Sequence, residues 1–242
     1  MKQNKIVSCR VGEIKFMKII IINGSPRKNG VTASILHIIE ENLKKNRVDT
    51  RFVNLSEISM EHCTGCCSCY KTGHCYIDDD AERLSIEIEK ADGIVIGSPT
   101  YASNISGYLK QFIDRGHFVI EQLLHNKYAI TIATGENYGS KDTSNVLNKL
   151  INYSGGKISG KLIFNVPFNE KIQSNINIIK KSENVADRLF SDIENHKQYF
   201  FQDIIHNMIF FIGIKPFVIK KGEKYSGIKN RWNKIGILNE NS

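Results

Sequence analysis

The segment from Met17 to Glu40, MKIIIINGSPRKNGVTASILHIIE, constrains the fold of this chain most strongly. Ile19 to Ile22 form a short run of β-branched apolar residues, which is typical of a strand buried on both faces. Turn-forming residues and two cations follow between Asn23 and Gly30. Apolar residues then recur at helical spacing from Ile35 to Ile39. The segment therefore predicts a buried strand, a tight turn and a helix in direct succession.

This succession favours an anion site, because free backbone N–H groups and the positive end of the helix dipole converge on one point. We expect Thr32 or Ser34 to cap the helix. The residues predicted to hold a phosphate are Ser25, Arg27, Asn29, Thr32 and Ser34. Neither G-x-G-x-x-G nor G-K-[ST] occurs here, so the turn is neither a dinucleotide fingerprint nor a Walker A loop. An ordinary strand-to-helix turn is the alternative.

Four further apolar runs and three helical patterns follow in alternation. The runs are Arg51–Leu55, Ile94–Gly97, Tyr128–Ala133 and Leu162–Val166, and the helical patterns are Asp78–Lys90, Ser106–Ile120 and Lys141–Tyr153. Short buried strands that alternate with helices predict an α/β fold with a doubly wound parallel sheet. Three loops then meet at the carboxyl edge of the sheet, namely Gly24–Thr32, Ser98–Ser106 and Thr134–Gly139.

Five of the six cysteines fall in one short segment, CTGCCSCYKTGHC, which begins at Cys63. Cys63, Cys66, Cys69 and Cys75 form C-x2-C-x2-C-x5-C, with Cys67 as a spare thiol. Four thiolates at this spacing suit a [4Fe–4S] cluster or zinc. Free or redox-active thiols are the alternative. The flanking histidines, His62 and His74, are expected to be surface residues.

Two segments resemble the flavodoxin-like NADPH-dependent FMN reductases and iron–sulfur flavoproteins: the turn GSPRKNGVT and the loop SPTYASNISGYLKQFIDR, Ser98 to Arg115. The cysteine spacing resembles the compact motif of the iron–sulfur flavoproteins. The resemblance implies a flavodoxin-like strand order 2-1-3-4-5, bound FMN and a [4Fe–4S] cluster at the flavin edge. The residues that it implies along the flavin are Pro99, Thr100, Tyr101, Asn104, Ser106, Thr134, Gly135, Tyr138 and Gly139.

The predicted function is an FMN-dependent oxidoreductase that passes electrons between the cluster or NAD(P)H and an acceptor. A cluster-free NAD(P)H-dependent reductase of flavins, quinones or nitro compounds is one alternative, and a non-enzymatic electron carrier or redox sensor is another. A zinc-stabilised binding module is a third. No catalytic side chain is predicted, because the flavin supplies the redox chemistry at N5. Asp114 and Arg115 are expected to form a structural pair at the end of a helix.

The 242 residues suit one domain with extensions. We expect an N-terminal appendage over residues 1–16, a flavodoxin-like domain over 17–168, and a helical arm with a basic tail over 169–242. The run Tyr199–Ile219 is interrupted by polar residues, which argues against a membrane span. Met1 to Lys15 lack the apolar core of a secretory signal, which predicts a cytoplasmic protein.

The net charge of +8 accompanies no nucleic-acid-binding motif, so nucleic acid is not an expected partner. The expected partners are a small-molecule or ferredoxin-like electron donor and an acceptor. A homodimer or homotetramer is expected from the resemblance and from the apolar residues of the arm.

Overall fold

The computed structural model describes residues 17–238, so the predicted N-terminal appendage lies outside the described residues. Its core is a sheet of five parallel strands in the order β2-β1-β3-β4-β5. The strands are β1 (Lys18–Asn23), β2 (Asp49–Asn54), β3 (Gly93–Pro99), β4 (Tyr128–Gly135) and β5 (Lys157–Asn165). This confirms the predicted α/β fold and the flavodoxin-like order.

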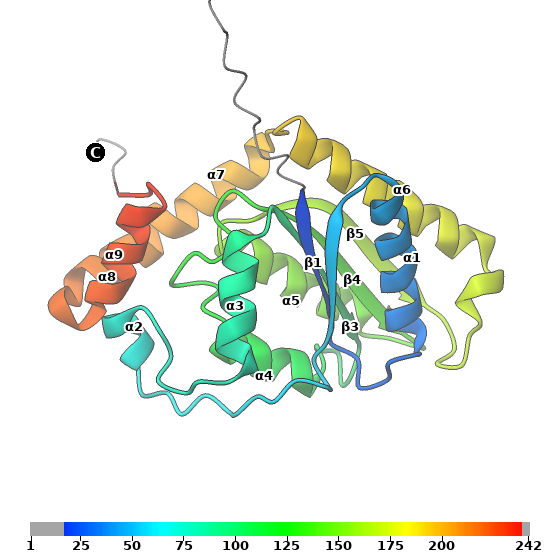
Figure 1. Ribbon diagram of the computed structural model, residues 1–242, viewed down its shortest axis with the longest axis horizontal. Coiled ribbons are helices and arrows are strands. Elements are labelled where there is room, and N and C mark those ends of the chain that lie inside the picture. Colours follow the sequence, from blue (N-terminus) through cyan, green and yellow to red (C-terminus); the bar gives the residue numbers. More distant parts are fainter. Residues whose placement is uncertain (1–16, 239–242) are drawn as a thin grey trace, which may run out of the picture.

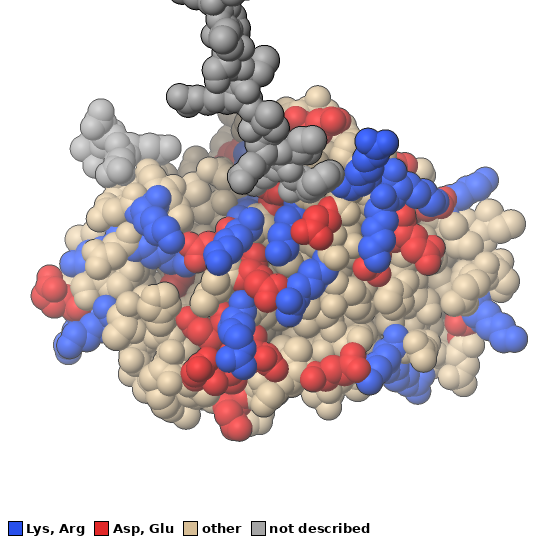
Figure 2. All heavy atoms as spheres, viewed as in Figure 1, with Lys and Arg blue, Asp and Glu red and all other residues tan. Residues whose placement is uncertain are grey.

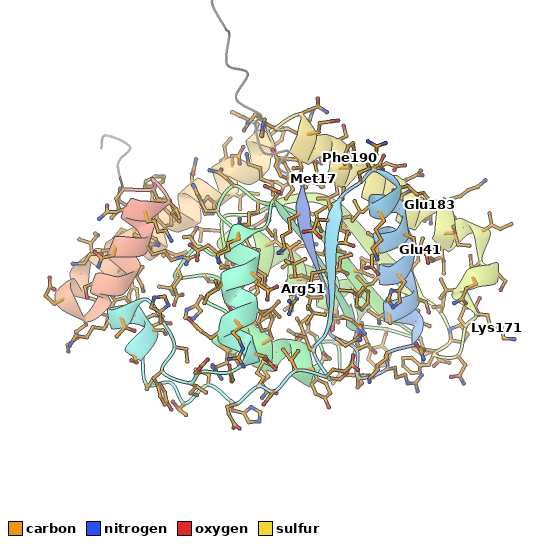
Figure 3. All side chains as sticks on the ribbon, in the orientation of Figure 1. Met17, Glu41, Arg51, Lys171, Glu183 and Phe190 are labelled. Atoms are coloured by element: carbon orange, nitrogen blue, oxygen red, sulfur yellow. The ribbon has the colours of Figure 1, made fainter. Side chains whose placement is uncertain are left out.

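Helices cover both faces of the sheet (Figure 1). On one face α1 (Val31–Lys45) and α6 (Ile176–Glu194) pack in one hydrophobic cluster with the sheet. On the other face lie α3 (Asp80–Lys90), α4 (Gly107–Arg115) and α5 (Ser140–Tyr153). Met17, which directly precedes β1, and Phe190 on α6 pack against the first cluster (Figure 3). The side chains of Ile19 to Ile22 have no exposed surface, as their β-branched run predicts.

Several helix and strand ends differ from the sequence expectation, and three of them have a clear physical reason. The N-cap of α1 is Gly30, without a side-chain cap, because the Thr32 hydroxyl bonds to Thr134 instead, at 2.7 Å between the oxygens. Helix α4 ends at Arg115 rather than at Ile120. The chain reverses at Gly116, where a Cβ would lie 2.5 Å from the ring of Phe118.

The fifth strand begins at Lys157 rather than at Leu162. Its first half contains polar residues and Gly160, so it lacks the continuous apolar run by which a buried strand is recognised in a sequence. At Gly160 a Cβ would lie 3.0 Å from the side chain of Val185, so the glycine lets α6 approach the strand closely. The helix expected from Asp78 to Lys90 is capped by Asp79, and Ser106, where the next helical pattern was expected to begin, caps α4.

The C-terminal segment contains helices, as predicted, but α6 belongs to the core of the sheet. A 3-10 turn (Ile172–Ser174) precedes α6, so the expected single helix from Ile172 to His196 is shorter. Beyond it come α7 (Phe200–Met208), a π-helical stretch (Ile209–Ile214), α8 (Lys215–Lys220), a 3-10 turn (Gly222–Tyr225) and α9 (Ser226–Lys234). These last elements form their own small cluster around the fully buried Trp232.

Residues 200–220 form one uninterrupted helix, which lies across the upper left of Figure 1. The π-helical stretch ends two residues before Pro216, whose missing N–H removes one helical hydrogen bond. The helix has a mean hydropathy of 1.2 and is 17% buried. By length and composition this helix can cross a membrane. The polar residues within it, which were expected to argue against a membrane span, therefore do not exclude one. A single such helix is weak evidence, and the absence of a membrane span stays a prediction.

Candidate functional site

Three loops meet at the edge of the sheet where the parallel strands end, as predicted. Thr100 N donates to Thr134 O at 2.7 Å, Gly24 N donates to Gly97 O at 2.8 Å, and the Thr32 hydroxyl joins that of Thr134. Two of these hydrogen bonds join backbone groups and the third joins two side chains, and together they connect the three loops. The three loops therefore form one rigid surface.

The phosphate turn is organised by Asn23, which the sequence reasoning missed. The fully buried Asn23 side chain accepts from Ser25 N at 3.0 Å and donates to Asn54 at 2.9 Å. The Ser25 hydroxyl accepts from Arg27 N at 3.1 Å, which leaves its own hydrogen free to donate to a ligand. Arg27 and Asn29 lie exposed beside the start of α1. The turn thus directs donors to the positive end of a helix.

The second loop makes a tight reversal at Ala102 and Ser103, which both have left-handed backbones with φ of 47° and 59°. Tyr101 and Asn104 pair across it through two backbone hydrogen bonds of 2.9 and 3.0 Å. Two successive non-glycine residues in this conformation are costly and are typical of functional loops. Ser106 plays a structural part: its hydroxyl donates to Gly24 O at 2.5 Å and caps α4.

The third loop touches the second at Gly139, which has a φ of 83°. A Cβ on Gly139 would lie 2.5 Å from the Ser103 hydroxyl oxygen, so only glycine fits. Tyr138 is 78% exposed at the tip of this loop. Its ring is therefore free to cover a flat ligand bound between the two loops.

Phe168, the last residue of the predicted domain, is a second residue that sequence reasoning missed. Its side chain lines all three adjoining hollows of this edge, of about 70, 440 and 170 Å³. Arg27 donates to Phe168 O at 3.3 Å, and its guanidinium lies 5.7 Å from the Phe168 ring centre. In the sequence Phe168 is simply an apolar residue that follows the fifth strand, and no motif indicates that it lines the site.

Between them the three hollows are lined by nine of the predicted site residues. These are Arg27, Asn29, Thr32, Ser34, Pro99, Thr100, Tyr101, Thr134 and Tyr138, whereas Ser25, Asn104, Ser106, Gly135 and Gly139 shape the loops around them. Two buried hydroxyl oxygens at this edge, on Thr100 and Ser140, have no hydrogen-bond partner among the described residues. Buried hydroxyls are normally satisfied. Their chemistry fits a polar, phosphate-bearing ligand such as FMN.

The cysteine segment leaves β2 at the same edge and reaches out to α2 (Ser68–Thr72), beside α9 (Figure 1). Arg115 holds both of its ends. The guanidinium of Arg115 donates to Glu61 O at 2.8 Å, just before the first cysteine, and to Ile77 O at 3.2 Å, just after the last. It also makes a bidentate pair with Asp79 at 2.8 and 2.9 Å.

This arrangement corrects the expected pair at the end of α4. Arg115 pairs with Asp79, whereas Asp114 pairs with Lys110 on the surface at 2.6 Å. Burial alone would raise the pKa of Asp79 and lower that of Arg115, but their mutual hydrogen bonds outweigh burial and shift both the other way. The pair is therefore fully charged and closes the base of the cysteine segment.

The cysteines lie on or beside one hollow of about 300 Å³, lined in part by Cys63, Cys67 and Cys69. Burial, and then the negative charge of Glu121, raise the pKa of the Cys69 thiol to about 12. The charges of Cys75 and Cys66 add to this rise. Thiols that repel one another's negative charge suit a shared cation. The donor set thus fits a metal or an iron–sulfur cluster.

The C-terminal helices pack directly on the cysteine segment. At Gly227 in α9 a Cβ would lie 2.3 Å from Gly73 N and 2.9 Å from Lys71 O. The Ser226 hydroxyl donates to Lys71 O at 3.1 Å, and the rings of Tyr70 and Tyr225 lie 4.8 Å apart. The end of the arm therefore forms one wall of the cysteine site.

The sequence matches the NADPH-dependent FMN reductase family over residues 17–171. The chain belongs to this family. It is 35% identical to an iron–sulfur flavoprotein of Clostridioides difficile over 231 residues, which cover 92% of this chain and all of that one. As a member of the family, the protein is a flavin-dependent oxidoreductase, and FMN is the flavin that the family membership supports.

Solved structures share the fold of this FMN reductase family member. A flavone reductase superposes with a TM-score of 0.62 at 19% identity, over 76% of this chain and 66% of that one. A flavodoxin from the domain Archaea superposes with a TM-score of 0.51 at 12% identity, over 74% of this chain and 99% of that one.

Proposed function

We propose that this oxidoreductase passes electrons between a [4Fe–4S] cluster on the cysteine segment and an acceptor, through FMN bound at the three loops. The main support is the joint placement of the two sites. The segment begins after β2, beside the phosphate turn, where Leu55 N donates to Asn23 O at 3.1 Å. Arg115, at the end of the helix that follows the second flavin loop, fixes the ends of the same segment.

For FMN, the proposed phosphate ligands are the Ser25 hydroxyl, the Arg27 guanidinium and the first N–H groups of α1. Asn29, Thr32 and Ser34 surround them. The backbone of the second and third loops would hold the ring, with Tyr101 and Tyr138 beside it. When bound, FMN supplies the hydride and single-electron chemistry. The protein binds it, orients it and shields one side from water.

For the cluster, the proposed ligands are Cys63, Cys66, Cys69 and Cys75. Their spacing supports this choice, as do the hollow that Cys63 and Cys69 line and the name of the C. difficile relative. Cys67 lies at the start of α2 with a left-handed backbone and serves as a spare thiol in the proposal.

The proposal is tested by purifying the protein without exposure to air and measuring iron, zinc and flavin per chain. We expect about four irons and one FMN, with a broad absorbance that dithionite bleaches. Flavin without iron in protein never exposed to air would contradict the cluster. Failure to take up added FMN would contradict the assignment of the three loops.

A second candidate is a cluster-free NAD(P)H-dependent reductase of flavins, quinones or nitro compounds. It is favoured by the description of the family and by the exposure of Cys63, Cys66 and Cys67. Turnover of NAD(P)H with an acceptor, unchanged in the C63S variant, would establish this function instead. A non-enzymatic carrier would show reduction by a ferredoxin-like donor without such turnover.

The proposed partners are a small-molecule or ferredoxin-like electron donor and an acceptor, in the cytoplasm. On the face in Figure 2, Lys and Arg are interspersed with Asp and Glu and form no continuous basic surface there. We also propose self-association as a homodimer or homotetramer. Its support is the apolar side of the helix over residues 200–220, where Phe201 is 80% and Ile212 74% exposed.

A further inference from the structure

A histidine that the redox proposal does not use lies against the cysteine site. His117 follows α4 in a left-handed conformation with a φ of 58°, and its side chain is 8% exposed. Its Nδ1 lies 3.0 Å from a carboxylate oxygen of Glu121, whose side chain is 7% exposed. Ligand atoms of Cys69, His117 and Glu121 all lie within 4.8 Å of one another. A sulfur, a nitrogen and an oxygen donor thus converge on one buried point.

The other ring nitrogen of His117 has the partner that metal-bound histidines usually have. Nε2 lies 2.6 Å from a carboxylate oxygen of Glu82, whose side chain is 11% exposed. Histidine ligands almost always donate their second N–H to a carboxylate or carbonyl, which fixes the ring and strengthens the ligand. Glu82 therefore presents Nδ1 of His117 toward Cys69 and Glu121.

We propose that, in chains whose cysteines hold no cluster, Cys69, His117 and Glu121 bind one divalent ion of the zinc class. Tetrahedral zinc with S, N and O ligands separates its ligand atoms by about 3.3 to 3.6 Å, so side-chain movements of about 1 Å complete the site. The ion replaces the proton on Nδ1 and that on the thiol. Water or a neighbouring thiolate fills the fourth position.

The local charge supports a cation at this point. The carboxylates of Glu121 and Glu82 both contact the one imidazole of His117, so two acidic groups face a single ring at this point. A mixed S, N and O set with tetrahedral spacing favours zinc over the hard ions magnesium and calcium. Because Cys69 belongs to both ligand sets, the divalent ion and the proposed cluster exclude each other.

The experiment uses the full chain with FMN bound, freed of iron by a chelator without air and with its thiols reduced. Zinc is titrated against a chromophoric chelator. We expect one tightly bound zinc per chain. The zinc affinity should fall at least about tenfold in H117Q and in E121Q, and about tenfold in E82Q. The C63S variant should bind zinc as the natural sequence does, since Cys63 is not a ligand of this site.

Cluster assembly provides the opposite pattern and separates the two proposals. H117Q should still take up about four irons, whereas C63S should not. The experiment can therefore contradict the divalent-ion site without contradicting the cluster, and the cluster without contradicting the divalent-ion site. Equal zinc affinity in H117Q, E121Q and the natural sequence would overturn the inference. Loss of zinc in C63S would do so too, because it would place the ion among the four cysteines.

Bound flavin reports whether each variant is folded, because the flavin loops lie outside this cluster. A cobalt spectrum gives a measurement that needs no variant. We expect tetrahedral Co²⁺ bands with the weak charge-transfer absorbance of one or two thiolates. The much stronger absorbance of four thiolates would contradict the mixed ligand set.

Discussion

The flavin edge and the cysteine segment lie at the same edge of one sheet, yet they are built in different ways. Each flavin loop follows a fully buried strand and bonds to its neighbours through backbone groups. The cysteine segment between Glu61 and Ile77 contains only the five-residue helix α2, and three of its thiols are exposed. Its shape depends on a few long-range side chains, chiefly those of Arg115 and α9.

This difference predicts different sensitivities. Loops fixed by the sheet keep their form without a ligand, so each change there should cost one interaction. A segment fixed at its ends and along one wall gains much of its remaining order from what it binds, because metal binding and local folding are coupled. Loss of one anchor should therefore remove the metal site while the flavin remains bound.

The largest effect is expected for R115M. The change leaves Asp79 as a buried carboxylate without its partner and frees both ends of the cysteine segment. We expect a loss of about 3–5 kcal/mol in the free energy of unfolding and loss of bound iron, measured by denaturation and iron analysis. The control is K110M, which removes only the exposed pair with Asp114 and should change both by little. Equal effects in the two variants would contradict the anchoring role of Arg115.

A smaller effect is expected for G227A. The added Cβ would overlap the backbone of Gly73 and Lys71, so α9 must move away from the cysteine segment. We expect a loss of about 1–3 kcal/mol of stability and faster loss of iron, with flavin retained. G213A lies in the same arm, where a Cβ meets no atom within 4 Å, and it should lose neither. If iron is retained equally in both, the arm does not support the cysteine site.

The S25A variant tests the flavin edge. Its hydroxyl accepts from Arg27 N and can donate to a phosphate, so its removal should weaken FMN binding by about 1 kcal/mol, roughly fivefold to tenfold. Fluorescence titration of the flavin-free protein measures the affinity. Iron content should not change. Loss of iron with unchanged FMN affinity in S25A would contradict the assignment of Ser25 to the flavin site.

The smallest effect concerns acid. Burial, and then the positive charges of His206 and Lys157, lower the pKa of His125 to about 4. The unfolded chain takes up a proton on this residue near pH 6.5, so stability is lost as the pH falls from about 6.5 toward 4. We expect about 1 kcal/mol of this loss to disappear in H125Q, measured by denaturant unfolding across that range. Parallel curves for H125Q and the natural sequence would refute this.

The same contrast explains what the sequence could predict. The strands, the three loops and the caps at Asp79 and Ser106 are local patterns, in which neighbouring residues carry the signal. The pair between Arg115 and Asp79 joins residues 36 positions apart, and nothing nearby marks Arg115 as its partner. Phe168 likewise reaches the site only because the chain after β5 folds against the phosphate turn, where it contacts Arg27.

The central claim is that the cysteine segment exchanges electrons with the flavin. The most direct test mixes a reduced ferredoxin-like donor with the FMN-loaded protein without air and follows flavin bleaching, in the natural sequence and in C63S. We predict rapid bleaching in the natural sequence and bleaching slowed at least about tenfold in C63S, while dithionite reduces both. Equal rates with the donor would contradict the claim, because the flavin would then be reduced without the cysteine site.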